Sequence, residues 1–321
     1  MKIDRLERIN INDSPQWVLI RGKNDNAPLL LHVQAGPGLP IIPEADTMEK
    51  MLHLEEHFLV VYWDQRGCGK SYSKNTDASS INFSRLSDDI ISCVKYLLKT
   101  YHKQNTNISG YSIGASLALM AVAKQHDIFG NLFLVGTDVD IPRANSFAIE
   151  FALKKAKELN RVNLIKRIEE LLNTPIIDTK RFQQRAKILT DFRGITMHKN
   201  YNQLVFSSIK NILFSKSYIL TDVAKTIKGM EFCQNALLPE MDTFNLFDLI
   251  TSIAAPVHFV HGRHDGVAPH DITQSFFKQI QAPEKKFTTF ENSAHMPHYD
   301  EPDKFAELLI SECLSKNKQY N

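Results

Sequence analysis

The segment Gly110-Tyr111-Ser112-Ile113-Gly114 has the residue types of a nucleophile held in a sharp turn. It stands between a short predicted strand at 107–109 and a helical pattern at 113–126, so its serine would follow a strand and open a helix. Such a turn forces the serine backbone into a strained conformation, and the flanking glycines leave room for it. The hydroxyl would then project at the positive end of a helix. The motif therefore predicts Ser112 as a nucleophile.

A serine attacks a carbonyl carbon efficiently when a base removes its proton, and a third group must hold that base. Two later segments supply these groups. Asp265 follows the apolar strand pattern at 255–262, and His295 follows the small residues after the last strand candidate, 285–291. Active-site residues of such sheets lie at the carboxyl ends of the strands, where these side chains can reach Ser112. We therefore predict His295 as the base and Asp265 as the residue that orients it.

Other residues compete for these two roles. Asp300 and Glu291 are alternative carboxylates, and Asp265 is preferred because it lies directly at the end of a strand. His298 is an alternative base, three residues beyond His295. If it is not the base, we expect His298 to pack or to form a hydrogen bond within its loop.

The tetrahedral intermediates of acyl transfer carry an oxyanion that needs two backbone N–H donors. One donor is normally the residue after the nucleophile, here Ile113. The other comes from the loop after the strand predicted at 29–33, which reads Gln34-Ala35-Gly36-Pro37-Gly38. Pro37 has no N–H group, so Gly36 is the predicted second donor.

Composition and charge are those of an ordinary globular protein. The chain has 321 residues, 43% of them hydrophobic and 23% charged, and its net charge of +2 gives no indication of nucleic acid or another polyionic partner. The amino terminus lacks the apolar core of a signal peptide, and the longest apolar run, 117–123, is far below the roughly 20 residues of a membrane span. We expect a cytoplasmic protein that acts on a small molecule or a short peptide, with no membrane partner; its oligomeric state is open.

No cofactor and no metal site are predicted. The four cysteines are scattered without a C-x-x-C pair and are expected to be free thiols, Cys68 included. Three histidines, at 258, 261 and 264, lie along a strand end, but no fourth ligand accompanies them.

The segment "WDQRGCGKSY", residues 63–72, ends like a phosphate-binding loop, yet Asp64 stands where that loop has glycine. A carboxylate is the wrong charge beside a phosphate, so nucleotide binding is not expected. Instead, we predict that Asp64 and Arg66 hold neighbouring loops by charged hydrogen bonds. Lys70 and Ser71 are predicted to face solvent or to start the next segment.

Strand and helix patterns alternate at both ends of the chain, whereas residues 143–245 carry helical patterns throughout. Alternation of this kind predicts a parallel sheet with helices on its faces. We therefore predict an α/β core formed by residues 1–141 and 246–321, interrupted by an all-helical cap, 142–245. Strands are expected at 16–22, 29–33, 57–63, 107–109, 131–137, 255–262 and 285–291.

These motifs resemble the α/β-hydrolase superfamily and, within it, the proline iminopeptidase (prolyl aminopeptidase) group. The resemblance spans most of residues 15–315 and is weakest across the helical insertion. It implies an eight-stranded, mostly parallel sheet with a helical cap inserted after the sixth strand. It also implies a serine hydrolase that works through an acyl-enzyme on a small amide or ester. The segments that carry it are "QAGPG" (34–38), "WDQRGCGKS" (63–71), "GYSIGAS" (110–116), "GRHD" (262–265) and "SAHMPHYDEP" (293–302).

The chain differs from the iminopeptidase pattern at positions that are expected to affect which substrate is bound. Gln34, a candidate substrate-binding residue, and Ala35 stand where the family has His-Gly, and Ile113 stands where the iminopeptidases tend to carry Trp. The family recognises the free amine of its substrate through carboxylates of the cap. Glu231 is the candidate for that role here, with Glu240 nearby.

Two classes of function follow. Within the hydrolases, an N-terminal proline peptidase competes with a carboxylesterase, a lactonase or a thioesterase of secondary metabolism. The alternative from another class is a ligand-binding protein that shares the fold without catalysis. The presence of all three residues, Ser112, Asp265 and His295, favours the hydrolase.

Overall fold

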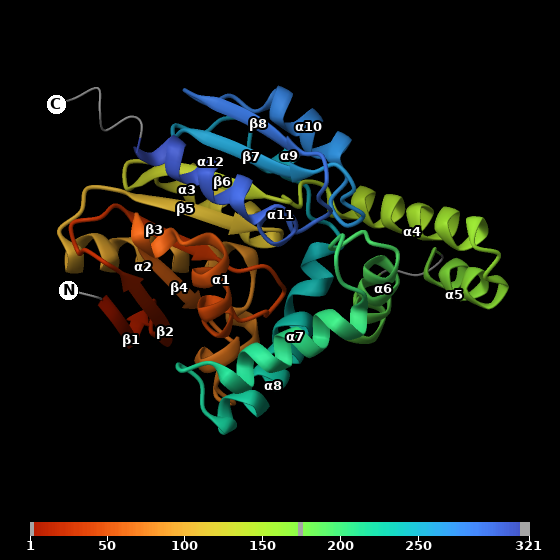
Figure 1. The fold of residues 1–321 in the computed structure, drawn as a ribbon, viewed down its shortest axis with the longest axis horizontal. Coiled ribbons are helices and arrows are strands. Elements are labelled where there is room, and N and C mark those ends of the chain that lie inside the picture. Colours follow the sequence, from red (N-terminus) through yellow and green to blue (C-terminus); the bar gives the residue numbers. More distant parts are fainter. Residues whose placement is uncertain (1–2, 173–175, 315–321) are drawn as a thin grey trace.

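The computed structural model describes residues 3–172 and 176–314, which form an eight-stranded sheet between two layers of helices (Figure 1). The strand order is β1-β2-β4-β3-β5-β6-β7-β8; β2 is antiparallel to both its neighbours, and the other pairs are parallel. The predicted fold is confirmed. The strands are β1 (Ile3–Ile11), β2 (Ser14–Gly22), β3 (Leu29–Val33), β4 (Leu59–Asp64), β5 (Thr106–Tyr111), β6 (Phe129–Val135), β7 (Val257–Gly262) and β8 (Lys285–Phe290).

The edge strand β1 lies outside the strands predicted from the sequence. Its residues, IDRLERINI, are rich in charged side chains and mostly exposed or half-buried. It forms the edge of the sheet and pairs with β2 alone. Charged side chains on an edge strand discourage pairing with another molecule. They also remove the apolar pattern by which a strand is recognised in a sequence.

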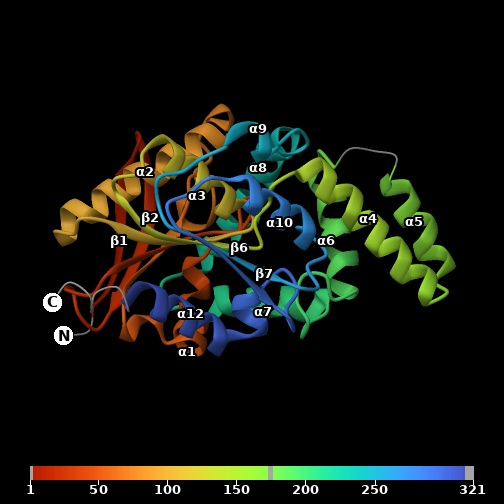
Figure 2. The same ribbon diagram turned by 90° about the horizontal axis from the view of Figure 1, so that it is seen from above.

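Helices cover both faces of the sheet (Figure 2). On one face lie α2 (Phe83–Tyr101), α3 (Ile113–Lys124) and α10 (His270–Gln279), and on the other lie α1 (Ala45–Leu52) and α12 (Pro302–Leu314). The two faces bury separate apolar clusters. All residues of β3, β4, β5 and β7 are buried, as expected for strands covered on both sides.

The segment between β6 and β7 consists of helices and loops in its described residues. Its first two helices, α4 and α5, project away from the sheet (Figures 1 and 2), and with α6 they bury an apolar cluster of their own. A β-bridge between Asp140 and Asn245 joins the two ends of the segment. The helices are α4 (Ile141–Glu158), α5 (Val162–Leu172), α6 (Thr179–Asp191), α7 (Tyr201–Phe214), α8 (Leu220–Met241) and α9 (Leu246–Leu249).

The division into a core and a cap with boundaries at 142 and 245 stays a prediction. Residues 173–175 of the predicted cap, and residues 1–2 and 315–321 of the predicted core, lie outside the described residues. None of the helices in the described part of the chain combines the length and the apolar character that crossing a bilayer requires.

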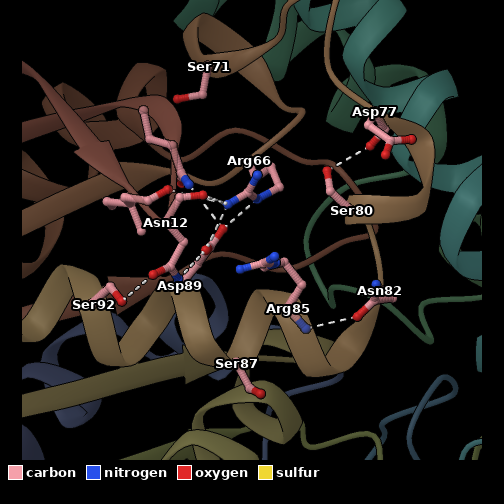
Figure 3. Close-up of polar contacts among 12 residues, drawn as sticks. Asn12, Arg66, Ser71, Asp77, Ser80, Asn82, Arg85, Ser87, Asp89 and Ser92 are labelled. Atoms are coloured by element: carbon pink, nitrogen blue, oxygen red, sulfur yellow. Dashed lines mark hydrogen bonds and ion pairs between the residues drawn. The ribbon is translucent and has the colours of Figure 1, made fainter.

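The loop after β4 holds neighbouring segments together, as predicted for Arg66. Its guanidinium forms a two-point ion pair with Asp89 of α2, with Nε 2.7 Å from Oδ2 and Nη2 3.0 Å from Oδ1 (Figure 3). Nη2 also donates hydrogen bonds to the carbonyl oxygens of Ile11 and Asn12, between β1 and β2. Arg66 therefore links the loop, α2 and the edge of the sheet.

We expect Arg66→Ala to lower stability and activity together. Both side chains of the pair with Asp89 are buried, so the substitution leaves a carboxylate without its cation and destabilises the fold by about 3–5 kcal/mol. Denaturant unfolding and hydrolysis, measured on one preparation, test this. The control is Lys23→Ala, since the ion pair of Lys23 with Glu56 is exposed and is expected to matter little. An Arg66 variant as stable as the Lys23 variant would contradict the expectation.

The prediction that Lys70 and Ser71 face solvent or start the next segment is wrong. Both are buried within a short 3-10 turn. The ammonium of Lys70 lies 2.6 Å from Oδ2 of Asp222 on α8. Asp64 accepts hydrogen bonds from three backbone N–H groups and from the hydroxyl of Tyr218, which precedes α8. The loop that resembles a phosphate site thus binds the helical segment to the sheet.

Candidate active site

Ser112 occupies the turn between β5 and α3 with φ 54° and ψ −125°. Residues other than glycine seldom adopt such a conformation, and holding it costs about 1–3 kcal/mol. The backbone N–H of Ser112 donates to the carbonyl of Val135 at 2.8 Å, and the N–H of Ala115 donates to the carbonyl of Ser112 at 2.9 Å. The neighbouring strand and the new helix therefore fix the strained turn that the sequence predicts.

The two glycines of the motif allow close approach of backbone. A Cβ atom at Gly110 would lie 2.7 Å from Cα of Ala115, and one at Gly114 would lie 2.2 Å from the carbonyl oxygen of Gln34. The start of α3 consequently packs directly against the end of β3. This contact brings the two predicted oxyanion donors together, since a Cβ at Gly36 would lie 3.6 Å from Cγ2 of Ile113.

His295 and Asp265 form a pair in which Nδ1 lies 2.8 Å from Oδ2. The other carboxylate oxygen of Asp265 accepts hydrogen bonds from the N–H groups of Val267 and Ala268, at 2.8 and 2.9 Å. His295 packs against the backbone of Gly136, where a Cβ would lie 2.9 Å from Nδ1. The imidazole is thereby held between the ends of β6 and β7.

The pair shifts the ionisation of both groups. Burial lowers the pKa of His295, but the charge of Asp265 and its hydrogen bond raise it, so the pKa lies above the usual value. Burial raises the pKa of Asp265, but the opposite effects of His295 prevail and the pKa lies below the usual value. An ionised carboxylate beside the ring stabilises the imidazolium that forms when the ring accepts a proton.

The competing residues have other partners. The ring of His298 packs against that of Tyr111 in a tilted arrangement with centroids 4.4 Å apart, and burial keeps the pKa of His298 well below the usual value. Asp300 accepts hydrogen bonds from the hydroxyl of Thr196 and from backbone N–H groups of the two adjoining loops. Glu291 pairs with Arg263 at the surface. Of the three carboxylates weighed, Asp265 is the one that contacts His295.

Asp138 is a residue of the site that the sequence reading did not identify. Its Oδ2 accepts a hydrogen bond from Oγ of Ser112 at 2.8 Å, and its backbone carbonyl accepts one from Ser116 at 2.5 Å. Burial raises the pKa of Asp138, although His295 and Ser112 oppose the shift. Its position in the sequence could have suggested this role, because Asp138 follows β6, which neighbours β5 in the sheet and ends at the same edge.

Arg185 of α6 is the second residue that the sequence reading did not identify. Its side chain is buried, and its charge interacts with those of Asp138, Asp265 and His295. Burial lowers the pKa of Arg185 against the effect of both carboxylates. The helical spacing could have indicated that Arg185 is buried, because it places Arg185 on the same face of α6 as the buried Ile188 and Leu189.

Comparison with known proteins shows the family. Residues 28–302 match the family described as the alpha/beta hydrolase fold. The chain belongs to the α/β-hydrolase fold family. This α/β hydrolase is 29% identical to the probable aminopeptidase YbaC of Bacillus subtilis over 306 residues, which cover 95% of this chain and 94% of that protein.

Two further comparisons match a protein named as an esterase and a structure named as related to proline iminopeptidases. It is 22% identical to the pimeloyl-[acyl-carrier protein] methyl ester esterase of Pseudoalteromonas atlantica, covering 96% of this chain and 98% of that one. Its fold matches that of a proline iminopeptidase-related protein from Thermus thermophilus, with a TM-score of 0.67, 16% identity and 96% of each chain covered. The predicted family resemblance is confirmed, and hydrolysis is the activity that these relatives support.

Gln34 of this α/β hydrolase supports its own loop. Its Oε1 accepts hydrogen bonds from the N–H of Gln65 at 3.2 Å and from the thiol of Cys68 at 3.0 Å. Burial raises the pKa of Cys68 well above the usual value, so this thiol stays protonated. Gln34 lies two residues before Gly36, and its contact with substrate stays a prediction.

Glu231 lies exposed on α8 and is not among the buried residues around Ser112. Its placement argues against the predicted role as anchor of a substrate amine. Glu240, the other acid considered, accepts a hydrogen bond from the N–H of Phe83 at the start of α2 and so joins two helices.

Two histidines of β7, His258 and His261, form hydrogen bonds with other residues of the protein. His258 pairs with the hydroxyl of Thr288 at 2.7 Å, and His261 pairs with the carbonyl of Ala268 at 2.8 Å. Within residues 3–172 and 176–314, no group of three or more His, Cys, Asp or Glu side chains is arranged to hold a metal ion.

Proposed function

We propose that this α/β hydrolase is a serine aminopeptidase, similar to the proline iminopeptidases, that removes the first residue of a small substrate through an acyl-enzyme. The observation that carries the proposal is the contact of His295 with Asp265 at 2.8 Å, at the sheet edge where Ser112 stands in its strained turn. The similarity to a probable aminopeptidase over nearly the whole chain supports it.

In this mechanism Oγ of Ser112 attacks the carbonyl carbon of the substrate while His295 takes the hydroxyl proton. Asp265 holds the ring and stabilises the imidazolium. The N–H groups of Gly36 and Ile113 donate hydrogen bonds to the oxyanion. The bond to the leaving amine breaks as His295 returns the proton to it. Water then attacks the acyl-enzyme by the same route, which releases the acid and restores Ser112.

Asp138 is proposed as the anchor of the substrate's free amine, in place of Glu231. In the acyl-enzyme, the ammonium stands two bonds from the carbon that is bonded to Oγ of Ser112. A carboxylate oxygen 2.8 Å from Oγ is therefore within reach of it. Hydrogen bonds from an ammonium to a carboxylate are stronger than those from a neutral hydroxyl. The substrate would thus displace Ser112 from Asp138 and leave the hydroxyl to His295.

The hydrogen bonds of the buried aspartates support this role. Ser112 is the one hydrogen-bond donor to the Asp138 carboxylate among the described residues. Each other buried aspartate accepts hydrogen bonds from at least three residues, which leaves little capacity for a ligand: Asp64, Asp89, Asp222, Asp265 and Asp300. Asp138 retains acceptor capacity beside the nucleophile.

We expect Asp138→Asn to impair hydrolysis of prolyl-naphthylamide far more than hydrolysis of p-nitrophenyl acetate. Loss of a buried charge pair with the ammonium is expected to lower kcat/KM for the prolyl substrate about 30-fold, or about 2 kcal/mol. The acetyl ester has no amine and does not use this contact. Asp127→Asn, which removes an exposed carboxylate on the loop before β6, is the matched control.

Two outcomes would contradict the proposal. If the wild type hydrolyses p-nitrophenyl esters and no amine-bearing substrate, the protein is an esterase, lactonase or thioesterase rather than a peptidase. If Asp138→Asn impairs both substrates equally, Asp138 acts on Ser112 and does not recognise the amine.

A further inference from the structure

Arg185 is a buried cation on α6. The residue is 8% exposed, and within the described part of the chain its fully buried Nε has no hydrogen-bond acceptor. Among the described residues, its guanidinium forms no ion pair and no hydrogen bond. Burying a charged group without hydrogen bonds is unfavourable. A bound ligand with an anionic group would supply the hydrogen-bond acceptors that the guanidinium of Arg185 lacks.

The nearby carboxylates, Asp265 and Asp138, do not accept a hydrogen bond from the guanidinium of Arg185. Asp265 is already bonded by two backbone N–H groups and by His295. Asp138 accepts its hydrogen bond from Ser112 and interacts with Arg185 through charge alone. The contrast with Arg66 is direct, because that buried arginine forms a two-point ion pair with Asp89.

The segment that follows Arg185 is hydrogen-bonded to the loops of the proposed triad. The end of α6, one turn beyond Arg185, packs on the loop of the catalytic acid: the N–H of Gly194 donates to the carbonyl of Leu189, and the N–H of Gly266 donates to the carbonyl of Gly194 at 2.9 Å. The hydroxyl of Thr196 donates a hydrogen bond at 2.6 Å to Asp300, at the end of the short helix α11 (Pro297–Asp300), which follows His295. These bonds join the helical segment to both loops of the proposed triad.

We propose that Arg185 binds the carboxylate of the leaving amino acid, so that this enzyme cleaves free dipeptides in preference to peptides whose second residue has no free carboxylate. The inference rests on the proposed function. Among the described residues, Ser112 is the one donor to the Asp138 carboxylate and Nε of Arg185 has no acceptor; both side chains are buried, and their charges interact. A dipeptide carries an ammonium on the acyl side of the scissile bond and a carboxylate on the leaving side. Its ammonium is opposite in charge to Asp138, and its carboxylate is opposite in charge to Arg185.

The forked guanidinium also suits this role, because it offers parallel N–H donors to the two oxygens of a carboxylate. A longer peptide or a C-terminal amide would put a neutral amide in the same place and leave the buried cation without its anion. The preference should therefore appear as a difference in kcat/KM between a dipeptide and its amide.

The test compares Pro-Gly with Pro-Gly-amide on the wild type, on Arg185→Met and on Lys180→Met. Lys180 is an exposed cation on the same helix and serves as the control. We expect the wild type and Lys180→Met to prefer Pro-Gly by roughly 30-fold in kcat/KM. In Arg185→Met the preference should fall to about one. Arg185→Lys should retain part of it, since the charge remains while the fork is lost.

Prolyl-naphthylamide separates this inference from the proposed function. If the wild type cleaves prolyl-naphthylamide but cleaves Pro-Gly and its amide equally well, the role of Arg185 is refuted and the aminopeptidase stands. If the wild type cleaves none of the three, the proposed function itself fails. The comparison of Pro-Gly with Pro-Gly-amide on the wild type tests the inference even if Arg185→Met does not fold. If Arg185→Met folds and still prefers Pro-Gly as strongly as the wild type, the inference is also overturned.

Discussion

Ser112→Ala is expected to lower kcat by about a million-fold on every substrate that the protein hydrolyses. The attacking oxygen is lost, and neither His295 nor the oxyanion donors can replace it. Alanine keeps the Cβ and with it the strain of the positive φ, and it removes the hydroxyl and its hydrogen bond to Asp138. Steady-state kinetics with the fastest substrate, and thermal unfolding to show that the fold persists, provide the measurement.

The control for this variant is Ser275→Ala, which removes an exposed serine hydroxyl on α10. It should retain wild-type rates. Substantial hydrolysis by a purified Ser112→Ala protein, with the same substrate preference as the wild type, would rule out Ser112 as the nucleophile.

Asp265→Asn is expected to lower kcat by about ten-thousand-fold. An amide in this place can donate a hydrogen bond to Nδ1 of His295, which favours the ring tautomer that cannot take the proton of Ser112. The substitution also removes a charge that raises the pKa of His295. The base acts in its neutral form, so the acid limb of the pH profile should move to lower pH. A pH profile of kcat/KM for wild type and variant measures both effects.

Glu291→Gln tests the competing assignment. Glu291 is exposed and pairs with Arg263, so its amide variant should keep the wild-type rate and pH profile. A ten-thousand-fold loss in Glu291→Gln together with an active Asp265→Asn would reverse the roles assigned to the two carboxylates.

The sequence predicted the residues that stand at strand ends. Ser112, Asp265 and His295 each follow a predicted strand, and a parallel sheet brings such ends to one edge. Gly36 and Ile113 were predicted from the usual positions of oxyanion donors and from the missing N–H of Pro37. The structure adds that the start of α3 packs on the end of β3, where Gly114 meets Gln34.

The sequence was less informative where contact depends on packing between distant segments. Lys70 has the type of a solvent-exposed residue, and it is buried because Asp222 of α8 lies 2.6 Å from it. Glu231 is an acid in the expected helix, but it lies two residues, or roughly 200° around α8, from the buried Cys233. The face that a helix buries is decided by the surface on which it docks.

Asp138 and Arg185 illustrate the same limit within the site. Asp138 stands at the correct edge, but its bond to Ser112 depends on how β6 ends and on the anchor from Ser116. Arg185 lies on the apolar face of α6, where a charge is expected to be paired. That its Nε has no acceptor among the described residues could be learned only from the packing of α6.

The most direct measurement of the central claim is labelling with a fluorophosphonate probe followed by peptide mapping. We predict a single adduct, on Ser112 in the peptide that contains Gly110 and Gly114, formed by the wild type and not by Ser112→Ala. An active wild-type preparation that forms no adduct, or one in which the adduct maps to another residue, would contradict the account.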